Sequence, residues 1–259
     1  MQLTGGRMRV ELLAAIGGLS FVAASLVIGV RLLLLARRTG ELPELAVGLA
    51  LFLMGGIAYP MLSVARLAVG WSEPLRLGLG TSALLLNGFG TISVAVFNWR
   101  VFRPGERWAR NAVGAIAAVL VASLLCQVLS GGLREAALSN RGLGLRLFMF
   151  FLGPSLAWAS YESIRFHGLL VRRARLGLAD PIVTDRMWLW GISTLCAFVL
   201  NMATSIGALF FGIDFAATAF GALMIAPLGL IAACGMWLAF LPPASYTRRV
   251  SARAATSEA

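Results

Sequence analysis

The sequence contains few of the residues from which metal and catalytic sites are built. It has one histidine, His167, and three cysteines, none of them in a C-x-x-C pair. A single histidine excludes histidine-rich zinc sites and a haem held by two histidines of this chain. There is also no nucleophile-elbow motif, paired-aspartate motif or glycine-rich phosphate loop. We therefore expect no metal site, no cofactor and no enzymatic activity.

Charged residues are scarce as well. They make up 13% of the chain, against 59% apolar residues, and the mean hydropathy is +0.85. Soluble domains contain about 25% charged and about 45–50% apolar residues. The apolar residues here form long runs that are separated by short polar segments, which is typical of helices that cross a membrane. The composition predicts an all-α integral membrane protein.

Seven apolar stretches are long enough to span a bilayer, since a transmembrane helix needs about 20 residues. They are residues 10–36, 45–70, 77–101, 111–130, 144–168, 187–211 and 215–241. We expect a seven-transmembrane-helix bundle that occupies residues 1–243 as one domain. The polar segment 244–259 has little to bury and is expected to be disordered.

The helix starts are most clearly marked in the last two spans. Asp180 followed by Pro181 is typical of an N-cap and the first helical residue. Asp214 is the expected N-cap of the last helix.

Lysine is absent, so all 22 basic residues are arginine. The polar segments on one side of the expected membrane hold fourteen arginines, and those on the other side hold seven. The positive-inside rule then places the N-terminus outside and the C-terminus in the cytoplasm. We expect a multi-pass protein of a bacterial inner (cytoplasmic) membrane. This rule accounts for the positive charge, so no nucleic-acid partner is expected.

The absence of lysine also limits the possible pigments. Seven helices with the N-terminus outside is the topology of microbial rhodopsins, but topology alone does not fix function. Rhodopsins hold retinal as a Schiff base on a lysine of the last helix, and this chain has no lysine. Covalent retinal is excluded, whereas non-covalent binding of a carotenoid or another lipid stays open.

Polar residues recur on one face of the second, third, fifth and sixth expected helices, at 100° per residue. They predict either hydrogen bonds between helices or a polar-lined pocket among these four helices. The candidate pocket residues are Tyr59, Asn87, Thr91, Trp158, Tyr161, Glu162, Asn201 and Thr204.

Apart from Glu11, at the very start of the first expected span, Glu162 is the only acidic residue expected within a span. Proton pumps and ion-coupled transporters usually need several carboxylates at membrane depth, so a pump is not expected. Arg165 follows Glu162 by three residues, which predicts a local ion pair on one helix face. A role for Glu162 in gating or ligand binding is the alternative.

Two arginine-rich segments, residues 98–110 and 170–186, lie on the expected cytoplasmic side. Such a surface attracts anionic lipid headgroups, and it could also dock a membrane or cytoplasmic protein partner. The expected surface residues are Arg100, Arg103, Arg107, Arg172, Arg173 and Arg175.

Three functions are compatible with these features. The first is a sensor or receptor-like module that binds a ligand in the intramembrane pocket. The second is a small-solute or lipid transporter that uses the same cavity, and the third is an accessory subunit of a larger membrane complex. A transporter built from duplicated halves is less favoured, because the sequence has no convincing internal repeat.

Overall fold

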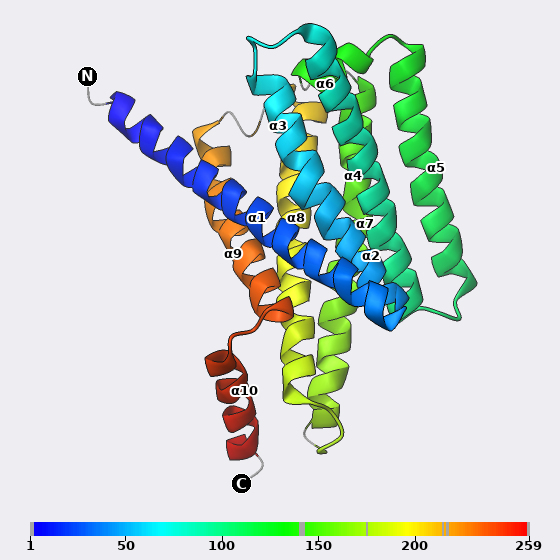
Figure 1. Ribbon diagram of the computed structural model, residues 1–259, viewed down its shortest axis with the longest axis vertical. Helices are drawn as coiled ribbons and strands as arrows, with labels where there is room; N and C mark the ends of the chain where they lie inside the picture. The colour runs from blue at the N-terminus through cyan, green and yellow to red at the C-terminus, as the bar shows by residue number, and fades with distance from the viewer. Residues whose placement is uncertain (1–2, 140–142, 175, 214, 216–217, 258–259) are drawn as a thin grey trace.

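The chain folds into an all-helical bundle in the computed structural model, which describes residues 3–139, 143–174, 176–213, 215 and 218–257 (Figure 1). Seven helical segments of this described part are long and apolar enough to cross a membrane. The seven are Ala15–Thr39, Leu42–Leu67, Glu73–Phe102, Arg107–Leu129, Leu143–Ala174, Pro181–Phe210 and Ala219–Phe240. The predicted all-helical class and the predicted number of apolar spans are therefore confirmed.

These segments carry the labels of Figure 1. The elements are α1 (Leu3–Thr39), α2 (Leu42–Ala50), η1 (Leu51–Ala58), α3 (Tyr59–Leu67), α4 (Glu73–Phe102), α5 (Arg107–Leu129), α6 (Leu133–Ser139), α7 (Leu143–Ala174), α8 (Pro181–Phe210), α9 (Ala219–Phe240) and α10 (Ala244–Ser257).

Helix α8 begins at the two residues that the sequence analysis predicted for its start. Asp180 Oδ1 accepts a hydrogen bond from Ile182 N at 2.8 Å, and Pro181 occupies the first turn. This confirms Asp180 as the N-cap. For α9, Asp214 lies outside the described residues, and Thr218 accepts the capping bond from Gly221 N at 2.9 Å.

The C-terminal segment differs from its prediction. Residues Ala244–Ser257 form helix α10 where we expected a disordered tail. The first turn follows Pro243, whose carbonyl accepts a hydrogen bond from Tyr246 N at 2.9 Å. The Tyr246 hydroxyl donates to Asp185 near the start of α8. The contact with α8 thus stabilises a helix in a segment that has few apolar residues to bury.

The second span is not a regular α-helix. Residues Leu51–Ala58 form the π-helix η1 between α2 and α3, and Tyr59 N bonds back five residues to Met54 O. Pro60 follows directly, and a proline both lacks an N–H and clashes with the carbonyl four residues before it. A wider turn ahead of Pro60 relieves that clash, which is a common cause of irregular turns within helices.

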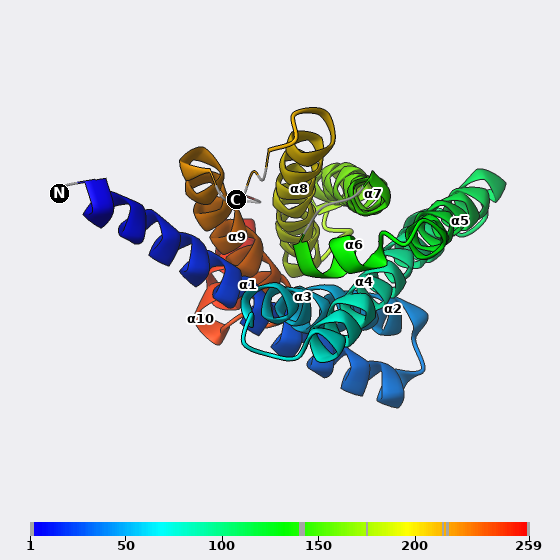
Figure 2. The ribbon, with the colours of Figure 1, turned by 90° about the horizontal axis from the view of Figure 1, so that it is seen from above.

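The helices pack in an arc with α1 and α9 at one end and α5 at the other (Figure 2). Helix α8 lies between α7 and α9, and α4 packs against the second span, α5 and α7. Helix α1 crosses the second span where both backbones come close. A β-carbon at Gly29 would lie 2.7 Å from Phe52 N, so only glycine fits there. Small residues at crossings are typical of membrane helices, whose packing depends on close backbone approach.

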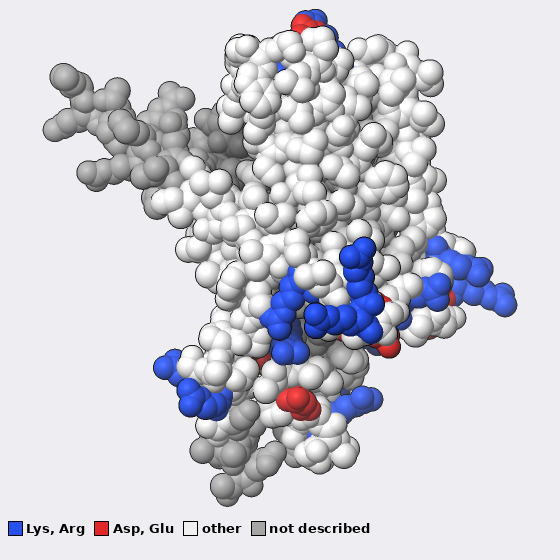
Figure 3. All heavy atoms as spheres, in the orientation of Figure 1, with Lys and Arg blue, Asp and Glu red and all other residues white. Residues whose placement is uncertain are grey.

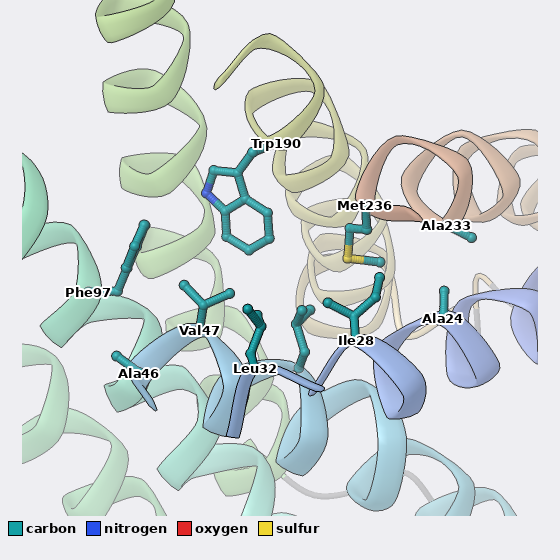
Figure 4. Packing of buried hydrophobic residues seen from close by; sticks show 10 residues of the cluster. Ala24, Ile28, Leu32, Ala46, Val47, Phe97, Trp190, Ala233 and Met236 are labelled. Carbon is teal, nitrogen blue, oxygen red and sulfur yellow. The ribbon is translucent and has the colours of Figure 1, made fainter. Parts of the chain in front are cut away.

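A buried apolar cluster joins five of the spans: α1, the second span, α4, α8 and α9 (Figure 4). Ile28 of α1 and Met236 of α9 meet there, below the indole of Trp190. The ring of Phe97 from α4 packs edge-on against Trp190, with centroids 6.1 Å apart. This cluster holds α1, α8 and α9 against α4 and thereby fixes one wall of the cavity described next.

Candidate ligand pocket

A cavity of about 380 Å³ lies among α1, the second span, α4, α7, α8 and α9. It occupies the half of the bundle that holds the C-terminal end of α8 and the N-terminal end of α7. Gly17 and Phe21 of α1 form one side, and Met54 and Gly55 of the π-helix adjoin them. The cavity is therefore partly built by the one span with an irregular backbone.

Four of the eight candidate residues lie on the cavity wall. They are Tyr59, Asn87, Asn201 and Thr204. The polar faces of the second span, α4 and α8 thus meet in one space. The hydroxyl of Thr204 donates within its own helix, to Leu200 O at 2.9 Å and Asn201 O at 2.9 Å, so its oxygen faces a ligand only as an acceptor.

Among the asparagine, serine and threonine side chains of this wall, two polar atoms have no hydrogen-bond partner among the described residues. They are Asn201 Oδ1 and Ser205 Oγ, and Ser205 is only 3% exposed. Buried polar atoms in proteins are nearly always hydrogen-bonded, so such atoms call for an explanation. A bound molecule or water in the cavity would supply the missing partners.

Thr91 does not line the cavity. It is fully buried, and its hydroxyl donates to Asn87 O at 2.9 Å on the preceding turn of α4. Thr91 Oγ1 also lies 3.8 Å from Met54 Sδ of the π-helix. Thr91 therefore belongs to the α4 contact with the second span, directly behind the cavity wall.

The three candidates of α7 lie elsewhere. The face of α7 that lines the cavity is apolar and consists of Leu145, Met149, Leu152 and Leu156, together with Arg146. Nine residues separate Leu152 from Tyr161, which places them about 180° apart around the helix.

Tyr161 consequently points out of the bundle and is 64% exposed. The Trp158 ring packs on Trp108 of α5, with centroids 5.5 Å apart. A polar stripe on a helix does not by itself determine how the helix is rotated about its axis. In α7 the polar stripe faces away from the cavity.

Glu162 forms an ion pair between helices. Arg103, directly after α4, donates from Nε to Glu162 Oε1 at 2.7 Å and from Nη2 to Oε2 at 3.3 Å. The predicted Arg165 contact is present but longer, at 3.5 Å to Oε2. The hydrogen bond to Glu162 raises the pKa of the Arg103 guanidinium above its ordinary value, against an opposing effect of burial. Glu162 therefore joins α4 to α7 at the end of the bundle opposite the cavity.

Some polar cavity residues were not among the candidates from the sequence. Arg66 of α3 lines the cavity and shares the polar face of the second span with Tyr59, and Arg146 of α7, which also lines it, was counted only as an arginine at a helix end. Ser205 was missed as well, and its position four residues after Asn201 places it on the same face of α8. That spacing is the signal by which Ser205 could have been found.

The expected basic surface is visible where α1 ends and α4 turns into α5 (Figure 3). Arg100 and Arg107 are exposed at the ends of α4 and α5 that this turn joins, and Arg172 and Arg173 are exposed in the last turn of α7. Arg100 lies over the Trp99 ring, 4.2 Å from its centroid. Arg103 is instead engaged with Glu162, and Arg175 lies outside the described residues.

No group of three or more histidine, cysteine, aspartate or glutamate residues in the described ranges is arranged to hold a metal ion. Comparisons with protein families, curated proteins and solved structures give no match to this chain. The cavity and its side chains are therefore the basis of the functional argument.

Proposed function

We propose that this protein is a receptor-like membrane module that binds a small, largely apolar ligand in the cavity. The observation that carries the proposal is the pair of unpartnered buried atoms, Asn201 Oδ1 and Ser205 Oγ, on the cavity wall. Ligand pockets are typically apolar, with a few polar groups that fix orientation. Asn87 and Tyr59 supply further polar groups around an otherwise aliphatic and aromatic wall.

Helix α8 supports a receptor-like role because it runs from the cavity to the opposite end of the bundle. Thr204 on the wall and Thr184 near the start of α8 are twenty residues apart, or about 30 Å. At that far end, His167 Nδ1 lies 2.8 Å from Thr184 O, and Asp185 accepts from Tyr246 of α10. A ligand that moved α8 would alter both contacts.

We also propose the orientation of the bundle. The cavity end faces outside, and the arginine-rich end faces the cytoplasm of a bacterium with this protein in its inner membrane. The distribution of arginine supports this orientation through the positive-inside rule. At the cytoplasmic face, the exposed arginines attract anionic lipid headgroups, at about 1 kcal/mol for each basic residue near the surface.

A cavity-filling variant tests the proposed binding site. Ala197 of α8 lines the deep part of the cavity, whereas Val199 of the same helix is exposed. The wild-type protein is purified in mild detergent, its visible spectrum is recorded, and co-purified small molecules are identified by mass spectrometry. We expect a bound compound that Ala197→Phe loses and Val199→Phe retains. Equal recovery from both variants would refute a ligand site in this cavity.

A transporter is the second candidate, favoured by the ion pair between Arg103 and Glu162. This pair joins α4 to α7 beyond the cavity and could keep that end closed while the other end is open. Reconstitution into proteoliposomes separates the two functions. A transporter carries the co-purified compound across the bilayer, and Glu162→Gln alters the rate, whereas a receptor binds the compound without transport.

A further inference from the structure

Two basic side chains line the cavity wall. Arg66 and Arg146 both line the cavity, and no aspartate or glutamate of the described ranges does. Arg66 donates to the carbonyl of Ala136 at 3.4 Å. Arg146 Nε is buried and has no hydrogen-bond partner among the described residues. Arg146 is thus a half-buried cation on the cavity wall, with a buried Nε donor that has no partner among the described residues.

Two acidic residues of the described ranges are engaged away from Arg146. Glu73, at the start of α4, binds Arg134 through both carboxylate oxygens, at 2.6 and 2.8 Å. Glu162 is at the opposite end of the bundle. A buried guanidinium is costly unless an anion pairs with it, and a carboxylate or phosphate can accept two parallel hydrogen bonds from it.

Most of the remaining wall is aliphatic or aromatic. Arg146 lies in the first turn of α7, and Leu156 on the same cavity-lining face lies ten residues further, or about 15 Å deeper. Leu152, Phe21 and Met54 also line the cavity. The volume of about 380 Å³ is near the lower end of ligand pockets, roughly 300–1,000 Å³. The space therefore suits one hydrocarbon chain better than two.

We infer that the cavity binds a single-chain amphiphile whose anionic head, a carboxylate or a phosphate, pairs with Arg146. The inference rests on the proposed function, because it assigns a ligand class to the same cavity. The chain extends past Leu152 toward Leu156. Ser205 and Asn201 lie along this path: the Ser205 hydroxyl can donate to an oxygen of the ligand, whereas Asn201 Oδ1, beside Gly153, can only accept from a ligand hydroxyl or a water.

Matched probes test the ligand class. Binding of hexadecanoate, hexadecyl phosphate, hexadecan-1-ol and inorganic phosphate to the detergent-purified protein is measured by native mass spectrometry. The first three share one chain and differ in the head, whereas inorganic phosphate has the anion without a chain. We expect either anionic amphiphile, or both, to bind at least tenfold more tightly than the alcohol, and inorganic phosphate to bind far more weakly than either.

Variants assign the preference to Arg146. Arg146→Gln should reduce the acid-over-alcohol preference about tenfold while hexadecan-1-ol still binds, and Arg146→Lys should retain most of the preference. Arg107→Gln, an arginine of α5 away from the cavity, is the control and should resemble wild type. The thermal unfolding midpoint of each variant shows that it is folded, and the alcohol affinity gives an independent check of the pocket.

The outcomes separate the two proposals. Equal binding of acid and alcohol, unchanged by Arg146→Gln, overturns the anionic class and leaves the pocket intact. Binding of none of the amphiphiles, with Ala197→Phe also without effect, overturns the pocket itself. Inorganic phosphate as tight as hexadecyl phosphate overturns the amphiphile and points to a free anion.

Asp214 needs its own variant, because it lies outside the described residues and next to Ile213, which lines the cavity. Asp214→Asn should leave the affinity for hexadecanoate within about twofold of wild type. A tenfold increase would mean that an internal carboxylate occupies Arg146, and would overturn the assignment of that arginine to a ligand.

Discussion

The ion pair between Arg103 and Glu162 gives the sharpest test of the helix packing. The sequence pairs Glu162 with Arg165 on one helix, whereas the structure pairs it chiefly with Arg103 across two helices. A double-mutant cycle with glutamine replacing each residue measures both couplings in the same protein. Glutamine matches glutamate in size but is shorter than arginine and has fewer donors, so the cycle subtracts the effect of each single substitution and leaves the pairwise coupling.

The expected magnitude follows from distance and exposure. Glu162 and Arg103 have side chains 5% and 23% exposed, and their closest atoms are 2.7 Å apart. Exposed pairs contribute about 0.2–1 kcal/mol, and breaking a fully buried pair costs about 3–5 kcal/mol. A coupling of about 2 kcal/mol is expected for this partly screened, two-bond contact. Arg165 is 48% exposed and touches Glu162 at 3.5 Å, so solvent screening reduces its coupling to about 0.3–0.5 kcal/mol.

The assay is reversible unfolding in mixed micelles with increasing dodecyl sulfate, followed by tryptophan fluorescence. Trp108 and Trp158 lie beside the ion pair and give a local signal. The reasoning fails if the coupling to Arg165 equals or exceeds the coupling to Arg103. In that case the main ion pair of Glu162 would lie within α7, and the proposed closure between α4 and α7 would lose its basis.

Three further outcomes test other parts of the bundle. Gly29→Ala should destabilise the protein by about 1–3 kcal/mol, because a β-carbon there meets the Phe52 backbone; Gly114→Ala, with open space around it, should not. The same unfolding assay measures both. An apolar maleimide should modify the exposed cysteines and spare the buried one, as read by mass spectrometry of intact protein. The exposed cysteines are Cys126 and Cys234, and the buried one is Cys196. Tyr246→Phe should increase tryptic cleavage within α10 about fivefold, since it removes the hydrogen bond to Asp185; unchanged cleavage would mean that this bond does not hold α10.

The spans could be predicted because a bilayer imposes a simple requirement. A helix must supply about 20 apolar residues, and this chain does so seven times. The start of α8 was predictable for a similarly local reason, since Asp180 and Pro181 are adjacent in sequence. The π-helix was not predicted, because Gly55 and Pro60 are compatible with a kink, a bulge or a regular helix. Only the packing against α1, where Gly55 meets Ser25, selects among these forms.

The site was predictable in part for an equally physical reason. Asn87 and Asn201 stand out because amides are rare among aliphatic residues of a span, and both lie on the cavity wall. The rotation of α7 depends on which neighbours it meets, and the sequence of one helix does not contain that information. Arg146 was missed because an arginine at a helix end is explained by membrane topology before any ligand is considered.

The position of the π-helix gives an independent reason to regard the cavity as built. Within a membrane, irregular backbone is tolerated mainly where it is buried in protein or lines a cavity. The π-helix Leu51–Ala58 meets both conditions: Met54 and Gly55 lie on the cavity wall, and Tyr59 continues that wall directly after it. Turns of this kind are frequent at functional sites. Gly17 and Gly55 also line the cavity, and a β-carbon at either position would collide with a neighbouring helix, at Ala226 of α9 and Ser25 of α1 respectively, so close helix packing borders the cavity. Backbone irregularity, small residues and unpartnered polar atoms thus coincide at one place, as a ligand site requires.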